Sequence, residues 1–215
     1  MRVLPLLLGS AGLAAAVVRV GRRTGVTDDE LAAVLPGDDV VPGARVVMDR
    51  ATTLPAPPEQ VWPWLVQLGK QRSGWYLPAW LETAIPWARR GIRTIDPRWQ
   101  GLTVGDVIPD WGGADATFEV VVLDAPRALV HRSTRPRRHG GTLQVSWALV
   151  LTPVPGGRTR LHLRLRISEL GHRAPALITA VGGLMDEATV RPMFAGLRER
   201  LAYSRKPTVP VTDAG

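Results

Sequence analysis

Hydrophobic and polar residues alternate along two neighbouring segments in the second half of the chain, residues 143–151 and 160–167. A period of two is typical of β-strands that have one apolar face. The intervening stretch, Pro153–Gly157, contains two prolines and two glycines, which favour turns. The pattern therefore predicts a long antiparallel hairpin over Gly141–Leu170.

The alternation also predicts how the two strands pair. If Thr152 pairs with Arg158, Trp147 lies opposite Leu163, and the odd-numbered apolar residues of both strands share one face. A shift by one residue would mix apolar and polar side chains on each face. The apolar face is expected to form a wall of the core or of a cavity.

Similar patterns predict the other elements of an antiparallel meander that is flanked by helices. One helix is expected to begin at Pro57-Pro58, because proline is tolerated in the first helical turn, and to bend at Pro63. The expected strands cover residues 45–54, 105–109, 117–123 and 128–134, and the expected helices cover 57–68, 80–82 and 174–204.

The C-terminal helix carries two apolar stripes that lie about half a turn apart. They change over beside Pro192, which predicts either one kinked helix or two helices. The first stripe comprises Leu177, Val181, Leu184, Met185 and Ala188, and the second comprises Val190, Phe194, Leu197 and Leu201.

The N-terminal part of the chain divides into an apolar segment and a linker. Residues 1–23 contain the apolar run Val3–Val18 followed by arginines, which favours a membrane anchor with a cytoplasmic flank. A cleaved secretory signal, or a plain helix packed on the body, stays an alternative. Residues 24–44 form a linker in which Thr27–Glu30 is a capping box for a short helix.

These divisions predict a folded domain over residues 45–206 and a flexible tail over 207–215. With an anchor, the domain would be held at the inner face of a bacterial membrane. With a cleaved signal, it would be secreted.

The 215-residue chain has a formal charge of +8 and no cysteine, so disulfides and thiol catalysis are excluded. The region from Ala125 to Ser168 contains nine arginines and no acidic residue. It is interpreted as a solvated outer face of the sheet, or as a surface that attracts anionic membrane lipids. Nucleic-acid binding is not favoured, because no aromatic residues are interleaved with the charge. Arg158, Arg160, Arg164 and Arg166 form a row on one sheet face, and Arg135, Arg137 and Arg138 cluster in the preceding loop.

Residues 70–100 contain an unusual number of aromatic side chains among glycines and prolines. Such a loop either shapes a binding site on a rigid scaffold or covers the core with bulky side chains. The aromatic residues are Trp75, Tyr76, Trp80, Trp87 and Trp99.

His131 is the most suggestive acid–base group in the sequence. If Leu129 faces the core, strand alternation makes His131 and Ser133 face it too, and a cavity imidazole could bind a ligand or move a proton. If Val130 faces inward instead, His131 is solvated. The histidines are scattered and no nucleophile–base pair is visible, so we expect no catalytic residue, metal or cofactor.

Several local motifs resemble bacterial members of the START/polyketide-cyclase superfamily (SRPBCC), including members with a membrane anchor. The resemblance implies an α+β helix-grip fold, in which a curved antiparallel sheet wraps around a long C-terminal helix and leaves an apolar cavity between them. The motifs are Ala56–Gly69, Gly74-Trp75-Tyr76, Trp80-Leu81-Glu82, Pro97–Gln100 and Val104–Asp106, together with residues 24–30 and 35–38 of the linker.

The resemblance also implies a function, the binding or carriage of a hydrophobic small molecule or lipid without chemistry. An enzyme of the cyclase or dehydratase kind, acting on a hydrophobic substrate in the same cavity, is the alternative. A scaffold whose interior is filled by its own aromatic side chains is a third. The expected ligand-binding residues are Tyr76, Trp80, His131, Trp147, Leu163, Leu165, Phe194 and Leu197.

Overall fold

The computed structural model describes residues 23–113, 115–136, 141–168 and 176–204. The predicted anchor or signal segment and the predicted tail therefore lie outside the described residues, apart from Arg23. The strands are β1 (Arg23–Thr24), β2 (Val46–Leu54), β3 (Val107–Pro109), β4 (Thr117–Asp124), β5 (Ala128–Pro136), β6 (Thr142–Val154) and β7 (Arg158–Ile167). The helices are α2 (Asp28–Ala32), α3 (Pro58–Gln67), α4 (Ala79–Glu82) and α5 (Ala176–Ser204), with the 3-10 helices η1 (Trp87–Arg89) and η2 (Pro97–Trp99).

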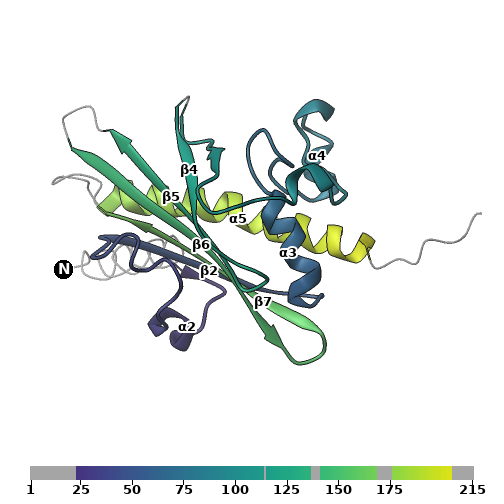
Figure 1. Cartoon of the computed structure of the whole chain (residues 1–215), viewed down its shortest axis with the longest axis horizontal. Helices are drawn as coiled ribbons and strands as arrows, with labels where there is room; N and C mark the ends of the chain where they lie inside the picture. The colour runs from purple at the N-terminus through teal and green to yellow at the C-terminus, as the bar shows by residue number, and fades with distance from the viewer. Residues whose placement is uncertain (1–22, 114, 137–140, 169–175, 205–215) are drawn as a thin grey trace, which may run out of the picture.

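The strands form one seven-stranded sheet in the order β1-β2-β7-β6-β5-β4-β3, in which all pairs except β1–β2 are antiparallel. The sheet curves around α5, while α3 and α4 lie beside one end of that helix (Figure 1). This is the α+β helix-grip arrangement that the sequence predicts.

The β6–β7 hairpin has the predicted faces but not the predicted partners. Val154 pairs with Arg158, so Trp147 lies opposite Leu165 instead of Leu163. The turn is shorter than expected because Gly156 and Gly157 both adopt positive φ angles, of 85° and 63°. A shift by two residues keeps every side chain on its predicted face, since the period of a strand is two.

The core lies between the concave face of the sheet, α3 and the C-terminal half of α5. The second predicted stripe of α5 is confirmed, because Val190, Phe194, Leu197 and Leu201 are all buried. In the first stripe Leu184 and Met185 are 38% and 64% exposed, so these two residues do not pack into the core. The helix runs without interruption through Pro192, which excludes the alternative of two helices.

The predicted linker begins in the structure after β1, which includes Thr24. Residues 25–44, called the linker from here on, cover the outer face of the sheet. The predicted capping box is present, with Thr27 Oγ1 accepting from the Glu30 amide at 3.2 Å and Glu30 Oε2 accepting from the Thr27 amide at 2.8 Å. Two glycines permit the close approach to the sheet. A Cβ on Gly25 would lie 2.3 Å from the Ala51 carbonyl oxygen, and one on Gly37 would lie 2.5 Å from a Val130 methyl group.

The arginine row of β7 holds this linker in place. Arg164 is 3% exposed and donates hydrogen bonds to Asp49 on β2 at 2.7 Å and to Asp38 of the linker at 2.9 Å. Arg160 pairs with Glu30 at 2.6 Å, and Arg166 pairs with Asp38 at 3.3 Å. The interpretation of the row as a solvated face is therefore wrong for these three arginines, because acidic residues more than a hundred positions away neutralise them.

Removing the Arg164 guanidinium should destabilise the whole domain. In Arg164→Ala, Asp49 loses a charged partner in a buried site and the linker loses its central attachment. We expect the free energy of unfolding to fall by roughly 3–5 kcal/mol in urea titrations. Arg158→Ala is the matched control on the same strand, and the exposed position should change stability by no more than about 0.5 kcal/mol. Equal effects of the two substitutions would contradict a structural role for the linker.

Candidate functional site

Five ring side chains meet on the face of the sheet that is turned toward α5. Trp147 on β6 stacks on His131 of β5, with ring centres 5.5 Å apart. It also stacks, at 6.1 Å, on Trp75 of the long connection between α3 and β3, which is called the loop from here on. Phe118 on β4 contacts both His131 and Trp147, and Trp111 meets the edge of Trp75 at 5.4 Å. These five residues are called the aromatic cluster. Trp147 is half-buried and Trp111 is 50% exposed, so the cluster extends from the interior to the surface.

His131 is the polar member of the aromatic cluster. Its side chain is buried, and among the described residues its Nδ1 atom has no hydrogen-bond partner. Burial lowers the pKa of His131 from 6.5 to about 4; a backbone hydrogen bond to Trp147 opposes this shift, and the nearby positive charge of Arg72 adds to it. At neutral pH the imidazole is therefore uncharged and can form one additional hydrogen bond within an aromatic surrounding.

The structure shows which residues of β5 point toward the aromatic cluster, although both faces of this strand are buried. His131 and Ser133 face the cluster side, as one alternative predicts, and both are buried. Val130 is also completely buried, because Gly37 of the linker packs against it on the outer face.

A polar rim borders the aromatic cluster at the end of β5. Arg135 donates to Ser133 Oγ at 3.0 Å, is hydrogen-bonded to Asp110, and lies over the Phe118 ring at 5.7 Å. Lys70 donates to the Asp110 backbone carbonyl at 3.0 Å. Arg135 is thus held by its neighbours and is not a free cation of the loop that precedes β6. No hydrogen bond joins the described side chains of Ser133 and His131, so the pair does not form a nucleophile and base.

The loop that carries Trp75 is tied to α5 by a buried arginine. Arg200 donates to Glu82 of α4 at 2.8 Å and to the carbonyls of Leu77, Gly91 and Ile92 at 2.8–3.0 Å. Trp75 itself donates its indole hydrogen to the carbonyl of Thr189 on α5, at 3.1 Å. The position of Trp75 over the cluster therefore follows from contacts between the loop and α5.

The structure brings together only some of the predicted ligand-binding residues. Trp147 pairs with His131 on one side and with Leu165 on the other, so these three residues form one continuous surface. Leu163 and Leu197 are core residues, 2% and 0% exposed. Phe194 lies in the same core and also borders a separate cleft between β2 and α5.

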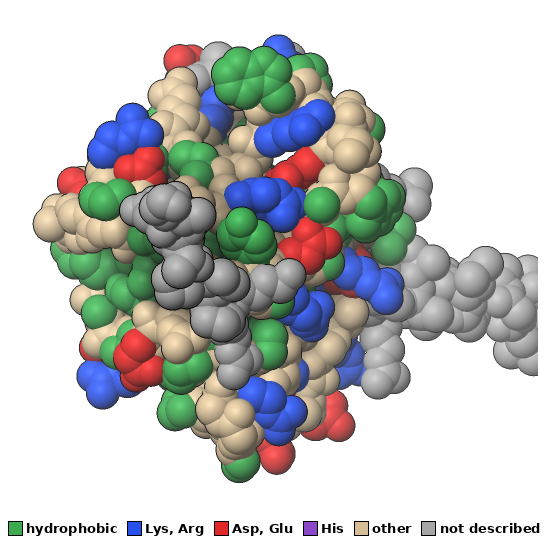
Figure 2. All heavy atoms as spheres, turned by 90° about the vertical axis from the view of Figure 1, so that its right-hand side faces the viewer, with side chains coloured by type: hydrophobic (Ala, Val, Ile, Leu, Met, Phe, Trp, Pro, Cys, Tyr) green, Lys and Arg blue, Asp and Glu red, His purple; other side chains and the backbone are tan. Residues whose placement is uncertain are grey.

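Tyr76 and Trp80 are both placed differently from the expectation. Tyr76 is completely buried, and its hydroxyl donates to the Trp64 carbonyl at 2.8 Å and lies 2.8 Å from Ser73 Oγ. Burial raises the pKa of Tyr76 to about 12, which is typical of a structural tyrosine. Trp80 is 70% exposed on α4. On the face of the molecule drawn in Figure 2, hydrophobic, basic and acidic side chains are interspersed.

The expected ligand-binding residues did not include Trp75, Phe118 or Trp111, although Trp75 belongs to the aromatic loop that was considered as part of a binding site. Phe118 could have been found from strand alternation, because it belongs to the apolar side of β4. No signal in the sequence indicates that Trp111, in a glycine-rich turn, packs on Trp75. Within the described parts of the chain, no three His, Asp or Glu side chains are grouped as metal ligands would be.

The fold defines a helix-grip protein, and the aromatic cluster lies on the concave side of its sheet. Residues 45–202 match the family described as polyketide cyclase / dehydrase and lipid transport. The match covers most of the chain, and the chain therefore belongs to this family. The predicted resemblance to the START/polyketide-cyclase superfamily is confirmed at this level.

Solved structures of similar proteins have low sequence identity to the chain. Protein MLL2253 from Mesorhizobium loti is 20% identical over 74% of this chain and 98% of its own, with a TM-score of 0.45. CalU16 from Micromonospora echinospora is 16% identical over 73% and 84%, with a TM-score of 0.40. DynU16, a protein of the dynemicin biosynthetic locus, is 17% identical over 74% and 48%, with a TM-score of 0.42. No functional conclusion follows from likeness at this level.

No curated protein was found to match the chain. Among the helices of the described residues, none combines the length and the apolar character required to cross a bilayer. The predicted anchor in residues 1–23 lies almost wholly outside that range and stays a prediction.

The burial of His131 predicts a pH dependence of stability. The pKa is about 4 in the folded state and near 6.5 when unfolded, so between these values the unfolded chain binds the additional proton. Stability should therefore fall as the pH decreases from 6.5 toward 4, by up to about 3 kcal/mol. Urea titrations at a series of pH values measure this effect. His131→Phe should flatten this part of the profile, and an unchanged slope would show that His131 is not buried as a neutral imidazole.

Proposed function

We propose that the protein binds and carries a hydrophobic small molecule or lipid, and that the aromatic cluster forms the contact surface. The main support is the stack of Trp75, Trp147 and His131, which reaches from the interior to the surface. Large aromatic side chains provide much apolar contact area, and their faces favour stacking with flat or unsaturated groups. A ligand with at least one flat, unsaturated portion suits this surface best.

His131 supplies a single polar contact for such a ligand. A buried neutral imidazole with a free ring nitrogen can bond to a hydroxyl or carbonyl group of the ligand, which would fix its orientation. Pairing with a ligand would also relieve the cost of a buried nitrogen that has no partner. The polar rim at Arg135 and Asp110 then forms the border of the site.

Carriage without chemistry is favoured because the described residues near the cluster lack a nucleophile paired with a base. The alternative is a cyclase or dehydratase in which His131 abstracts a proton from the substrate. One observation favours it, namely the unpartnered Nδ1 atom of His131, which leaves this ring nitrogen available to a substrate. The pKa of about 4 makes the imidazole a weak base, so the ligand would have to raise that pKa for proton abstraction at neutral pH.

Binding can be tested with purified protein and the neutral, flat dye Nile red. The wild-type protein should bind the dye, and Trp147→Leu should weaken binding about tenfold or more, because a loss of 1.4 kcal/mol of contact energy is tenfold. Trp80→Leu is the matched control, since Trp80 is exposed and is not among the described ring contacts of the cluster. Native mass spectrometry should show the same ranking for any hydrophobic molecule that is purified with the protein.

Two results would contradict this function. Equal binding by Trp147→Leu and the wild type would show that the cluster is not the contact surface. Loss of water from a bound molecule in the wild type, but not in His131→Phe, would establish the dehydratase alternative.

For the location of the protein we propose attachment to a membrane through residues 1–23, with the folded domain in the cytoplasm. The support is the apolar run with its trailing arginines. The electrostatic attraction of the protein to an anionic membrane surface would depend on the arginines that follow the apolar run. Arg160, Arg164 and Arg166 would contribute little, because acidic residues of the linker pair with them. Secretion after signal cleavage is the alternative.

Cell fractionation tests this location. The full chain should sediment with membranes, whereas a chain that begins at Arg23 should stay in the supernatant. A full-length chain in the supernatant would contradict the anchor, and a mature N-terminus near Val17 would establish the signal peptide.

A further inference from the structure

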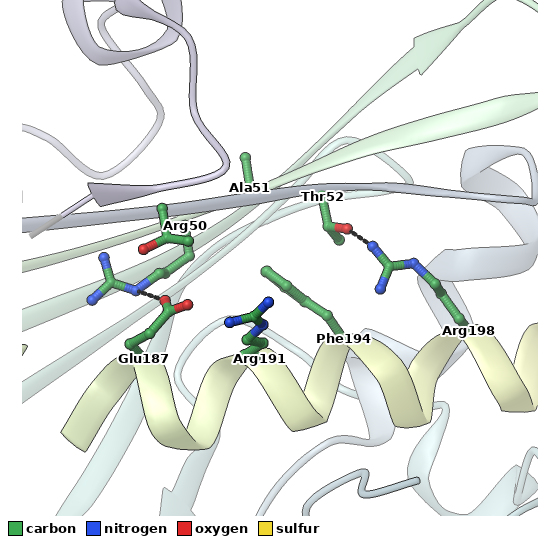
Figure 3. A pocket seen from close by; sticks show the side chains of 8 residues that line it. Arg50, Ala51, Thr52, Glu187, Arg191, Phe194 and Arg198 are labelled. Atoms are coloured by element: carbon green, nitrogen blue, oxygen red, sulfur yellow. Dashed lines mark hydrogen bonds and ion pairs between the residues drawn. The ribbon is translucent and has the colours of Figure 1, made fainter. Parts of the chain in front are cut away.

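A cleft of about 300 Å³ lies between β2 and α5, on a part of the molecule that the aromatic cluster does not reach. The side chains of Glu187, Arg191, Phe194 and Arg198 rise from α5 toward β2, which contributes the opposite wall (Figure 3). Its lining residues are Thr24, Arg50, Ala51, Thr52, Glu187, Arg191, Phe194 and Arg198.

The residues that line this cleft carry more positive than negative charge. Glu187 is the single acidic residue of the lining, and its carboxylate pairs with Arg50 Nε at 2.8 Å. Asp186, behind the lining, pairs with the same guanidinium at 3.1 Å. The acidic groups are thus engaged by Arg50, and the positive charges of Arg191 and Arg198 are not balanced by them.

Arg191 and Arg198 have no carboxylate within ion-pair distance in the described chain. Arg198 donates a hydrogen bond to the hydroxyl of Thr52, which holds its guanidinium against β2 at one end of the cleft. Partial burial lowers the pKa of Arg198, and no acidic group opposes that shift. The two arginines are seven positions apart on one helix, so they lie about two turns apart on the same side of it.

Phe194 lies between these two arginines along α5. Its ring reaches from the core into the cleft, so the cleft has an apolar portion beside its cationic portion (Figure 3). A ligand that fits both portions must carry an anionic group next to an apolar group. Guanidinium groups bind phosphate oxygens with paired, charge-assisted hydrogen bonds.

We propose that this cleft binds the phosphate group of a small amphiphilic molecule. Arg191 and Arg198 hold the phosphate oxygens, the Thr52 hydroxyl fixes Arg198, and Phe194 contacts the adjoining apolar chain. The site is independent of the aromatic cluster. Trp75 contacts the helix at Thr189, two positions from Glu187 and from Arg191, and positions two apart lie on nearly opposite sides of a helix.

Isothermal titration of the full-length protein with octyl phosphate tests this assignment. The wild-type protein should bind octyl phosphate at least about tenfold more tightly than octanol, which has the same chain without the charge. The double variant Arg191→Gln/Arg198→Gln should bind at least about tenfold more weakly, because charge-assisted hydrogen bonds are lost. The matched control is Arg89→Gln/Arg158→Gln, which removes the same net charge from exposed positions and should keep wild-type affinity.

Inorganic phosphate distinguishes the two sources of the anionic group. If inorganic phosphate binds more weakly than octyl phosphate, the site is assigned to a lipid-like phosphate. Equally tight binding that depends on the two arginines would confirm the phosphate site but assign it to the free anion. Wild-type affinity for octyl phosphate in Arg191→Gln/Arg198→Gln, with an unchanged melting temperature, would overturn the proposal.

A further variant separates this site from the proposed hydrophobic-ligand function. Trp147→Leu should keep wild-type affinity for octyl phosphate, whatever its effect on Nile red. Parallel loss of both ligands in Trp147→Leu would show that they share one site, which would overturn the independence of the cleft.

Discussion

The arrangement of the loop on the concave side of the sheet depends on the hydrogen bonds of the Arg200 guanidinium. This guanidinium is almost completely buried, is matched by the Glu82 carboxylate, and lies over the Tyr76 ring at 4.6 Å. Its donors also satisfy backbone carbonyls at three points of a loop that has little regular structure. Buried polar groups need such partners, so one side chain determines where the loop can lie. Burial lowers the pKa of Arg200, and the pairing with Glu82 counteracts that shift.

Close backbone contact makes this arrangement possible. A Cβ on Gly196 would lie 2.5 Å from the Leu77 carbonyl carbon, so α5 and the loop touch where a larger residue could not be accommodated. The loop is thereby held against α5 from Trp75 to Leu77. The aromatic cluster is consequently built on rigid neighbours, although Trp75 and Trp111 come from loops. Preorganised rings lose little conformational freedom when a flat ligand binds.

The helix-grip fold was implied by the resemblance of local motifs to a known superfamily. Helical periodicity predicted the buried stripe of α5 and strand periodicity predicted the hairpin faces, because both depend on the local spacing of apolar and polar residues. Strand periodicity could not predict the two-residue shift in the pairing of β6 with β7, since a shift by an even number of residues leaves every side chain on the same face. The arginine row of β7 has the pattern of a strand with one solvated face. Its partners Glu30 and Asp38 are remote in sequence, and no local pattern indicates that the linker returns to cover it. For the same reason the alternation around His131 was ambiguous, because β5 is covered on both sides.

The linker also affects the order in which the protein can fold during synthesis. Glu30 is synthesised 130 residues before its partner Arg160. At typical elongation rates this interval is on the order of ten seconds. During that time β2, which Gly25 contacts, and β5, which Gly37 contacts, are not yet part of one sheet, because β7 connects β2 to the other strands. The linker is therefore synthesised before the sheet that it covers but is among the last parts of the domain to reach its place, and until then it must stay soluble through its own acidic side chains.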